Sequence, residues 1–284
     1  SSALEIYKGR RDLSRRAVVY KMSGMSFREF IELALGVGLE SASLIDLTTS
    51  HQRIASDTIT SVEKKGKKIL ALFKDYLESG YYPYFREYNS KELFYITLEQ
   101  NIHTTLENDL MAIYPSLSGN SIKKIKKLLS FIAASVPYTP DLKSLKTMLD
   151  VGDERTLKTY LKYLEDAGVI LTVSRSGRGL GELEKPEKIY LNNPNLIHAI
   201  SGHASVNTGN MRETFFLNMT CASHKVSTPL KGDFLVDGKY TFEVGGKNKD
   251  FKQIRNMKDS FLAVDDIEIG AGSRIPLWIF GFLY

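Results

Sequence analysis

The sequence predicts an α/β protein with more than one domain, and three observations lead to this expectation. The chain has 284 residues, which is more than one ordinary hydrophobic core usually organises. Apolar residues recur at helical spacing through much of residues 26–166. Alternating apolar residues then predict a strand pair within residues 232–245. We expect a helical N-terminal part at 1–118, a second unit at 119–191, and a mixed-sheet unit at 192–284.

The composition restricts the classes of function. The chain is 43% hydrophobic and 25% charged, which is typical of a globular protein. Its net charge of +5 permits contact with nucleic acid without requiring it. The single cysteine, Cys221, excludes an internal disulfide and fits a cytoplasmic location. No apolar run reaches the roughly 18 residues of a membrane helix, so no membrane partner is expected.

The first 28 residues carry a concentrated positive charge. Seven of them are basic and two are acidic. The pairs Arg10–Arg11 and Arg15–Arg16 suit bidentate contacts with phosphate groups. A basic helix facing water, or facing an acidic partner, explains the same composition, so both interpretations stay open.

Three helices are expected in the rest of the N-terminal part. Ser26 is a good N-cap, and Glu29 completes a capping box with it. Residues 57–79 predict a second amphipathic helix, and residues 93–113 predict a third that ends before Pro115. Gly80 and Pro83 interrupt the chain between the second and third helices.

Residues 121–191 predict three helices followed by two strands. Asp141 and Asp153 are the expected N-caps of the second and third helices, and Gly168 is the expected stop of the third. Residues 169–176 and 187–191 read as strands on either side of a glycine-rich tip. This order of elements is the winged-helix plan.

A winged helix commonly places its third helix in the major groove of DNA. The basic candidates for DNA contact are Arg155, Lys158 and Lys162 on the third helix and Arg175 and Arg178 in the wing. Basic flanks of this kind position a protein on phosphates. Glu154 and Glu165 dilute the charge. A winged helix that acts as a spacer or as a protein contact is therefore the alternative.

Carboxylates mark the predicted strand pair of the C-terminal unit. Asp233 begins the first strand, and Glu243 lies between two apolar residues of the second. Glu213, on a helix expected from about residue 210, is a candidate third carboxylate. A further helix is expected after residue 250, then a strand, and residues 276–284 predict a terminal apolar strand.

Two carboxylates on neighbouring strands with a lysine nearby suit a hard divalent cation. The arrangement resembles the metal site of the PD-(D/E)xK nuclease superfamily, in which an aspartate is followed by Glu-x-Lys on the next strand. Asp233 and Glu243 match, whereas Gly245 stands at the lysine position. The resemblance implies Asp233 and Glu243 as ligands of Mg²⁺ or Mn²⁺, Glu213 as a further catalytic carboxylate, and Lys247 as the catalytic lysine. An ion pair between Glu243 and Lys247, or another cation, explains these residues without catalysis.

A second resemblance covers most of the chain. Residues 9–30 (GRRDLSRRAVVYKMSGMSFREF), 77–88 (LESGYYPYFREY) and 188–202 (KIYLNNPNLIHAISG) look like a bacterial and archaeal family of AAA-type ATPases with a restriction-endonuclease-like C-terminal domain. The resemblance implies an upstream ATPase core that binds ATP and Mg²⁺, contact of Arg11 or Arg16 with nucleotide phosphates, and assembly into oligomers. No G-x-x-x-x-G-K-[ST] motif occurs, so ATP hydrolysis is not expected from this chain alone.

Two functions follow from these observations. The first is a non-catalytic, regulatory part of such an ATPase that contacts DNA or a protein partner, and the glycine at position 245 favours it. The alternative is a metal-dependent nuclease that acts through the C-terminal carboxylates. Binding of a divalent metal distinguishes the two, because the first function needs none.

Overall fold

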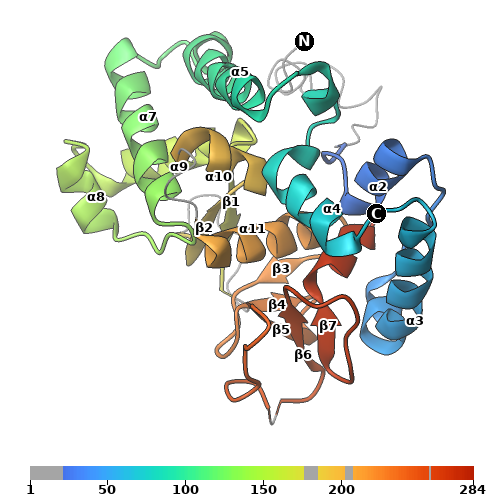
Figure 1. The fold of residues 1–284 in the computed structure, drawn as a ribbon. Coiled ribbons are helices and arrows are strands. Elements are labelled where there is room, and N and C mark those ends of the chain that lie inside the picture. The colour runs from blue at the N-terminus through green and yellow to red at the C-terminus, as the bar shows by residue number, and fades with distance from the viewer. Residues whose placement is uncertain (1–21, 176–184, 202–206, 256) are drawn as a thin grey trace, which may run out of the picture.

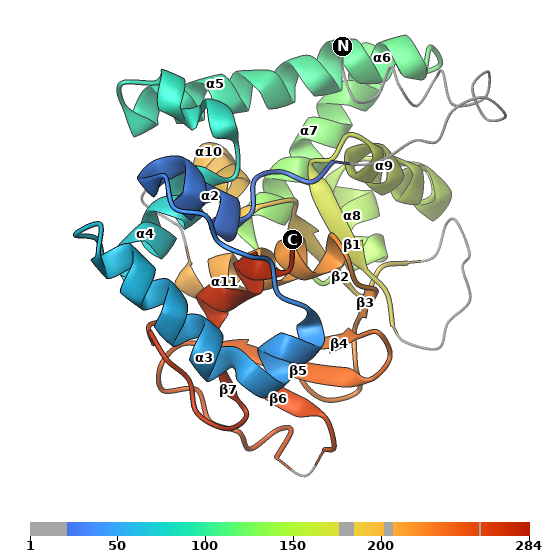
Figure 2. The same ribbon diagram turned by 90° about the vertical axis from the view of Figure 1, so that its right-hand side faces the viewer.

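The computed structural model describes residues 22–175, 185–201, 207–255 and 257–284. A sheet near the C-terminus lies at one end of the molecule, and the helices of residues 91–113 lie at the other (Figures 1 and 2). In the ranges described, no helix is both long enough and apolar enough to cross a membrane.

The N-terminal part is helical, as predicted. Helix α2 (Phe27–Leu35) begins at the expected capping box of Ser26 and Glu29. It is followed by α3 (Leu44–Glu63), α4 (Ile69–Asp75), the π-helical turn η1 (Tyr76–Gly80) and the 3₁₀ turn η2 (Pro83–Glu87). The prediction of a single helix at 57–79 is wrong. Gly66, in the left-handed conformation with φ of 70°, follows the end of α3 and separates it from α4.

The third predicted helix is confirmed as a continuous helical stretch of three pieces. These are α5 (Lys91–Thr104), the π-helical turn η3 (Thr105–Asp109) and α6 (Leu110–Ile113). Ser90 caps α5 by accepting a hydrogen bond from the N–H of Leu93. The stretch ends before Pro115, whose ring cannot continue a helix.

The middle unit has the predicted order of elements. Helices α7 (Gly119–Ala134), α8 (Leu142–Met148) and α9 (Glu154–Asp166) precede strands β1 (Ile170–Val173) and β2 (Lys188–Leu191). Asp141 and Asp153 accept the capping hydrogen bonds, and Gly168 has a φ of 67° after α9. The two strands are antiparallel, with Ile170 opposite Leu191. Classification of the unit as a winged helix stays a prediction.

The C-terminal unit contains a mixed sheet, as predicted. Helices α10 (Pro194–Ser201) and α11 (Thr208–Cys221) precede β3 (Val226–Ser227), β4 (Phe234–Val236), β5 (Tyr240–Gly245), β6 (Ser260–Val264) and β7 (Arg274–Pro276). The strands lie in this order across the sheet. Neighbours from β3 to β5 are antiparallel, whereas β5, β6 and β7 are parallel.

Two expectations for this unit are wrong. The described residues between β5 and β6 form turns, with Asp259 in the left-handed conformation at a φ of 53°, in place of a helix. The terminal segment is not one strand, because β7 ends at Pro276 and the 3₁₀ helix η5 (Leu277–Phe282) follows. Proline lacks the N–H that would extend the ladder. Trp278 instead packs edge-on against Phe27 of α2, with ring centroids 6.3 Å apart.

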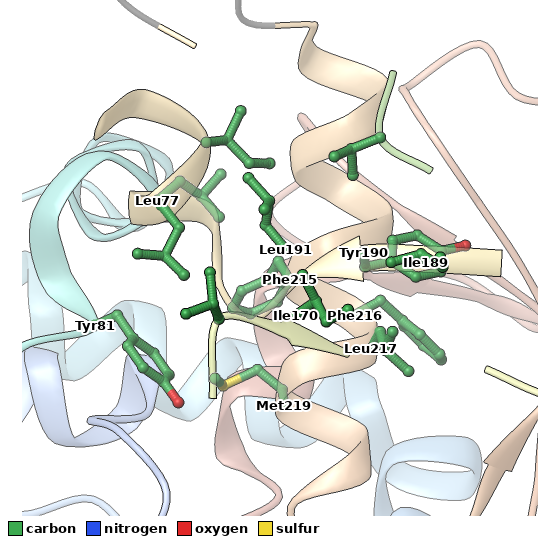
Figure 3. Close-up of a cluster of buried hydrophobic side chains, with 14 of the residues drawn as sticks. Leu77, Tyr81, Ile170, Ile189, Tyr190, Leu191, Phe215, Phe216, Leu217 and Met219 are labelled. Atoms are coloured by element: carbon green, nitrogen blue, oxygen red, sulfur yellow. The ribbon is translucent and has the colours of Figure 1, made fainter. Parts of the chain in front are cut away.

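Aromatic contacts join the two ends of the chain in one core. The ring of Phe27 packs on that of Phe73 at 5.2 Å, and Phe73 packs on Phe215 of α11 at 4.8 Å. The side chains of Ile170 and Leu191 in the β1–β2 hairpin lie close to those of α11 (Figure 3). The domain boundaries at 118 and 191 stay predictions. The hairpin and α11 are nevertheless packed so that residues of β2 lie beside the predicted carboxylates.

Candidate active site

Asp233 and Glu243 lie at the same end of the β4–β5 hairpin. Phe234 is opposite Phe242 at the end of the paired strands, Asp233 immediately precedes β4, and Glu243 follows Phe242 on β5. The N–H of Asp233 donates to the carbonyl of Phe242 at 2.9 Å. The Oδ2 atom of Asp233 accepts from the N–H of Val244 at 2.8 Å. The backbone of β5 therefore fixes Asp233 beside the strand that carries Glu243.

Glu243 is a buried carboxylate with one oxygen paired and one open. Its side chain is 2% exposed, and its Oε1 atom lies 2.6 Å from Nζ of Lys249. Among the described residues, no hydrogen-bond partner lies on its Oε2 atom, which is also buried. An ionised oxygen without a partner is costly in the protein interior. The buried Oε2 atom is therefore an acceptor that the described residues leave unsatisfied.

Lys249 is the cation of this hairpin. Burial lowers the pKa of its ammonium group, but the hydrogen bond and the charge of Glu243 outweigh burial and leave the pKa raised. The charges of Asp233 and Glu213 act in the same direction as Glu243. Lys249 thus stays protonated and lies within electrostatic reach of all three predicted carboxylates.

Gly245 leaves the space that the Lys249 side chain occupies. A Cβ atom at position 245 would lie 2.6 Å from Cγ of Lys249 and 2.7 Å from its Cβ and Cδ atoms. A side chain at position 245 and the observed placement of Lys249 therefore exclude each other. Lys249, four residues after Gly245, is the lysine that contacts Glu243.

The predicted lysine, Lys247, is exposed and is not the cation on Glu243. Its carbonyl accepts from Nη2 of Arg274 at 2.8 Å, and the carbonyl of Lys249 accepts from Nη1 of the same guanidinium at 2.9 Å. Arg274, on β7, thereby holds the turn in the geometry that directs Lys249 towards Glu243.

Glu213 comes to the site from α11. Tyr190 donates its hydroxyl hydrogen to Oε2 of Glu213 at 2.7 Å. Nζ of Lys188 lies 3.6 Å from the same oxygen and 3.8 Å from Oδ1 of Asp233. Burial raises the pKa of Glu213, and the charge of Asp233 raises it further, while Lys188 and Tyr190 oppose this shift. Glu213 and Asp233 are therefore neighbours that share one lysine.

Sequence reasoning missed Lys188 and Tyr190 as residues of this site. Both are on β2, two positions apart, so their side chains leave the strand on the same side. Burial and then the charge of Glu213 raise the pKa of the Tyr190 phenol above its ordinary value, which keeps it a proton donor. The sequence of residues 188–190 indicates a strand, and its period of two places Lys188 and Tyr190 on one face. No nearby residue in the sequence indicates that this face contacts Glu213.

Arg212, the neighbour of Glu213 in the sequence, forms its ion pairs with other carboxylates. Its Nε atom lies 2.7 Å from Oδ2 of Asp265, and its Nη2 atom lies 3.2 Å from Oδ2 of Asp266. A Cβ atom at Gly246 would lie 3.0 Å from the guanidinium. Gly245, the last residue of β5, and Gly246, which follows it, therefore make room for two different cationic side chains.

The donor chemistry of the site fits a hard divalent cation. Glu213, Asp233 and Glu243 offer only carboxylate oxygens, the ligands that Mg²⁺ and Mn²⁺ prefer. The open Oε2 atom of Glu243 adds an unused donor. No three acidic, histidine or cysteine side chains in the described ranges converge as a ready-made metal cage. Lys188 and Lys249 lie against the carboxylates instead.

The residues predicted to contact DNA lie mostly at the surface. Arg155 and Lys162 are exposed on α9, and Lys158 is half-buried. Lys162 forms an ion pair with Asp166 at 3.1 Å. Arg175 is exposed just after β1, and its backbone forms an isolated β-bridge with Thr228. Arg11, Arg16 and Arg178, predicted to contact nucleotide or DNA phosphates, lie outside the described residues.

Comparison with known proteins gives one match. Residues 70–207, slightly less than half of the chain, match a family described as a domain of unknown function (DUF8612). The matched range includes β2 with Lys188 and Tyr190 and ends just before α11. No curated protein and no solved structure matches the chain.

Proposed function

We propose that the C-terminal unit is a metal-dependent nuclease site that hydrolyses phosphodiester bonds. One observation carries this proposal, namely the pairing of Lys249 with the buried Glu243, whose second oxygen is open. Gly245 argues against catalysis only if no lysine reaches the carboxylates. Lys249 reaches them through the space that the glycine leaves. The cluster thus has the residue types of the PD-(D/E)xK pattern, with the lysine displaced along the chain.

Each residue has a role that its environment supports. Asp233 and Glu243 are the proposed ligands of Mg²⁺ or Mn²⁺. A bound cation would supply Lewis acidity towards a phosphate oxygen and would lower the pKa of a water molecule. Lys249 stabilises the negative charge that develops on the phosphate oxygens as water attacks phosphorus. The raised pKa of Glu213 suits it to accept the proton that water loses, while the departing oxygen leaves with one chain end.

Nicking of supercoiled plasmid DNA in the presence of Mn²⁺ tests this proposal. We expect the wild type to nick the plasmid and Glu243→Gln to lose at least about a hundredfold in rate, as expected for loss of a metal ligand. Glu99→Gln is the matched control, because Glu99 is exposed on α5, at the far end of the molecule from the sheet. Circular dichroism checks that both variants fold. Equal rates for Glu243→Gln and Glu99→Gln, or no nicking by the wild type, would refute the proposal.

A second candidate is the non-catalytic function, in which the α7–β2 unit contacts DNA or a protein partner as part of an AAA-type ATPase. Exposure of Arg155 and Arg175 at its surface supports it. Fluorescence anisotropy with duplex DNA at two salt concentrations tests the DNA contact. We expect the double variant Arg155→Ala/Arg175→Ala to bind several-fold more weakly and with a smaller salt dependence. Unchanged affinity would exclude these two arginines from a DNA interface.

A further inference from the structure

Lys188 lies between two carboxylates that belong to different elements. Its ammonium nitrogen is 3.6 Å from Glu213 of α11 and 3.8 Å from Asp233, which precedes β4. Both distances exceed those of a good N–H···O hydrogen bond. The ammonium group of Lys188 is therefore shared between two carboxylates. At these distances it can move away from both without breaking a short hydrogen bond.

Each of the two carboxylates has a shorter contact besides Lys188. Tyr190 holds Oε2 of Glu213 at 2.7 Å, and the N–H of Val244 holds Oδ2 of Asp233 at 2.8 Å. What Lys188 contributes is charge: it lowers the pKa of Glu213, which burial and the neighbouring Asp233 raise. The lysine therefore compensates the same concentration of negative charge that would attract a metal cation.

We infer that Lys188 is a tethered counter-cation that competes with the divalent metal for Asp233, and so sets the metal affinity of the site. This inference rests on the proposed function, since it concerns the same carboxylates. A divalent ion that takes an oxygen of Asp233 meets an ammonium group of like charge beside it. Metal binding therefore requires Lys188 to move away, and the lysine opposes binding both through the ion pairs that are lost and through repulsion of the metal charge.

Lys249 does not compete with the metal in this way. It lies 2.6 Å from a carboxylate that is 2% exposed, and Glu243 keeps its other oxygen open. Oε2 is the oxygen of Glu243 that remains for a metal, so the contact of Lys249 with Oε1 need not be exchanged. Of the two lysines against the carboxylates, Lys188 is thus the one whose contacts a cation must replace.

Calorimetric titration of the full chain with Mn²⁺ tests the inference. The samples are the wild type, Lys188→Met, Lys188→Arg and the control Lys252→Met, which removes an exposed lysine of the same unit. We expect Lys188→Met to bind Mn²⁺ at least about tenfold more tightly than the wild type, as loss of a like charge about 4 Å away implies. Lys188→Arg, which keeps the charge, should not tighten binding, and Lys252→Met should change the affinity by less than about twofold.

Several outcomes decide the inference. Mn²⁺ binding that appears only in Lys188→Met supports it, even if the wild type shows no measurable binding. Binding by Lys188→Met that is no tighter than that of Lys252→Met overturns it, as does the absence of binding in every sample. Thermal unfolding of each variant confirms that affinities are compared between folded proteins.

Plasmid nicking on the same samples separates the inference from the proposed nuclease function. Tighter Mn²⁺ binding by Lys188→Met without nicking in any sample supports the counter-cation and refutes the nuclease. Nicking by the wild type with equal Mn²⁺ affinity in Lys188→Met and Lys252→Met supports the nuclease and refutes the counter-cation.

Discussion

The two lysines of the carboxylate cluster differ in how they hold their partners. Lys249 follows β5 closely in sequence and contacts one buried oxygen of Glu243 at 2.6 Å. Lys188 arrives from β2, in another part of the chain, and is shared at 3.6 Å and 3.8 Å between two partly exposed carboxylates. Lysines therefore compensate the carboxylate charges of this site in two different ways. A tight, buried pair fixes the geometry of the site, whereas a loose, shared pair leaves ligands exchangeable.

The largest expected effect comes from removal of the tight pair. Lys249→Met leaves the buried Glu243 without a partner for either oxygen, so we expect a loss of about 3 kcal/mol in the free energy of unfolding. Urea denaturation at pH 7 measures it. Lys252→Met, which removes an exposed lysine nearby, should leave the unfolding midpoint unchanged within error. Equal midpoints for the two variants would show that the Lys249–Glu243 contact does not stabilise the fold.

A second variant displaces Lys249 without removing it. The methyl group of Gly245→Ala would collide with the Lys249 side chain at 2.6–2.7 Å. We expect a loss of about 1–3 kcal/mol, as for other overpacked positions, measured by thermal unfolding. Gly38→Ala is the control, because a Cβ atom there meets nothing within 4 Å. A Gly245→Ala protein as stable as Gly38→Ala would contradict the placement of Lys249.

The loose pair predicts a pH dependence. The pKa of Glu213 is raised above its model-peptide value of 4.5, so the folded state keeps a proton that the unfolded state has already lost. The contribution of Glu213 to stability is therefore complete below pH 4.5 and is lost as pH rises through the folded-state pKa.

Glu213→Gln removes this titration. We expect the difference in the free energy of unfolding, variant minus wild type, to increase from pH 4.5 towards pH 8, as measured by urea denaturation across that range. A difference that stays constant with pH would contradict the raised pKa.

The smallest effect is expected from Lys188→Met. Its two long ion pairs are each worth little, so we expect a change of about 1 kcal/mol or less in the free energy of unfolding. Chemical denaturation of this variant beside Lys249→Met compares the two lysines directly. A loss as large as that of Lys249→Met would make Lys188 a structural residue and remove the contrast between the two pairs.

The parts of the fold that were predicted correctly depend on neighbours in sequence. Ser26, Asp141 and Asp153 cap helices through residues two or three positions away. The β4–β5 hairpin likewise follows from alternation and the turn at Gly238. Pro276 marks the end of β7 locally, but the 3₁₀ helix that follows was missed because Phe27, the contact partner of its Trp278, lies at the other end of the chain.

The same distinction applies to the site. Asp233 and Glu243 lie at the same end of one hairpin, so their proximity was predictable. Lys188 reaches Glu213 only because the β1–β2 hairpin packs on α11, and the choice of Lys249 over Lys247 depends on a turn held by Arg274 of another strand. Contacts between distant segments leave no periodic signal in the sequence.

Plasmid nicking by Lys247→Gln and Lys249→Gln shows which of the two lysines acts in catalysis. Both variants remove one positive charge from the same turn, and glutamine at position 249 keeps a hydrogen-bond donor for Glu243. We expect Lys247→Gln to nick DNA in Mn²⁺ at about the wild-type rate and Lys249→Gln to be slower by about a hundredfold, as for loss of one electrostatic stabiliser of the transition state. Equal rates in the two variants, or a loss confined to Lys247→Gln, would contradict the assignment of Lys249 as the catalytic lysine.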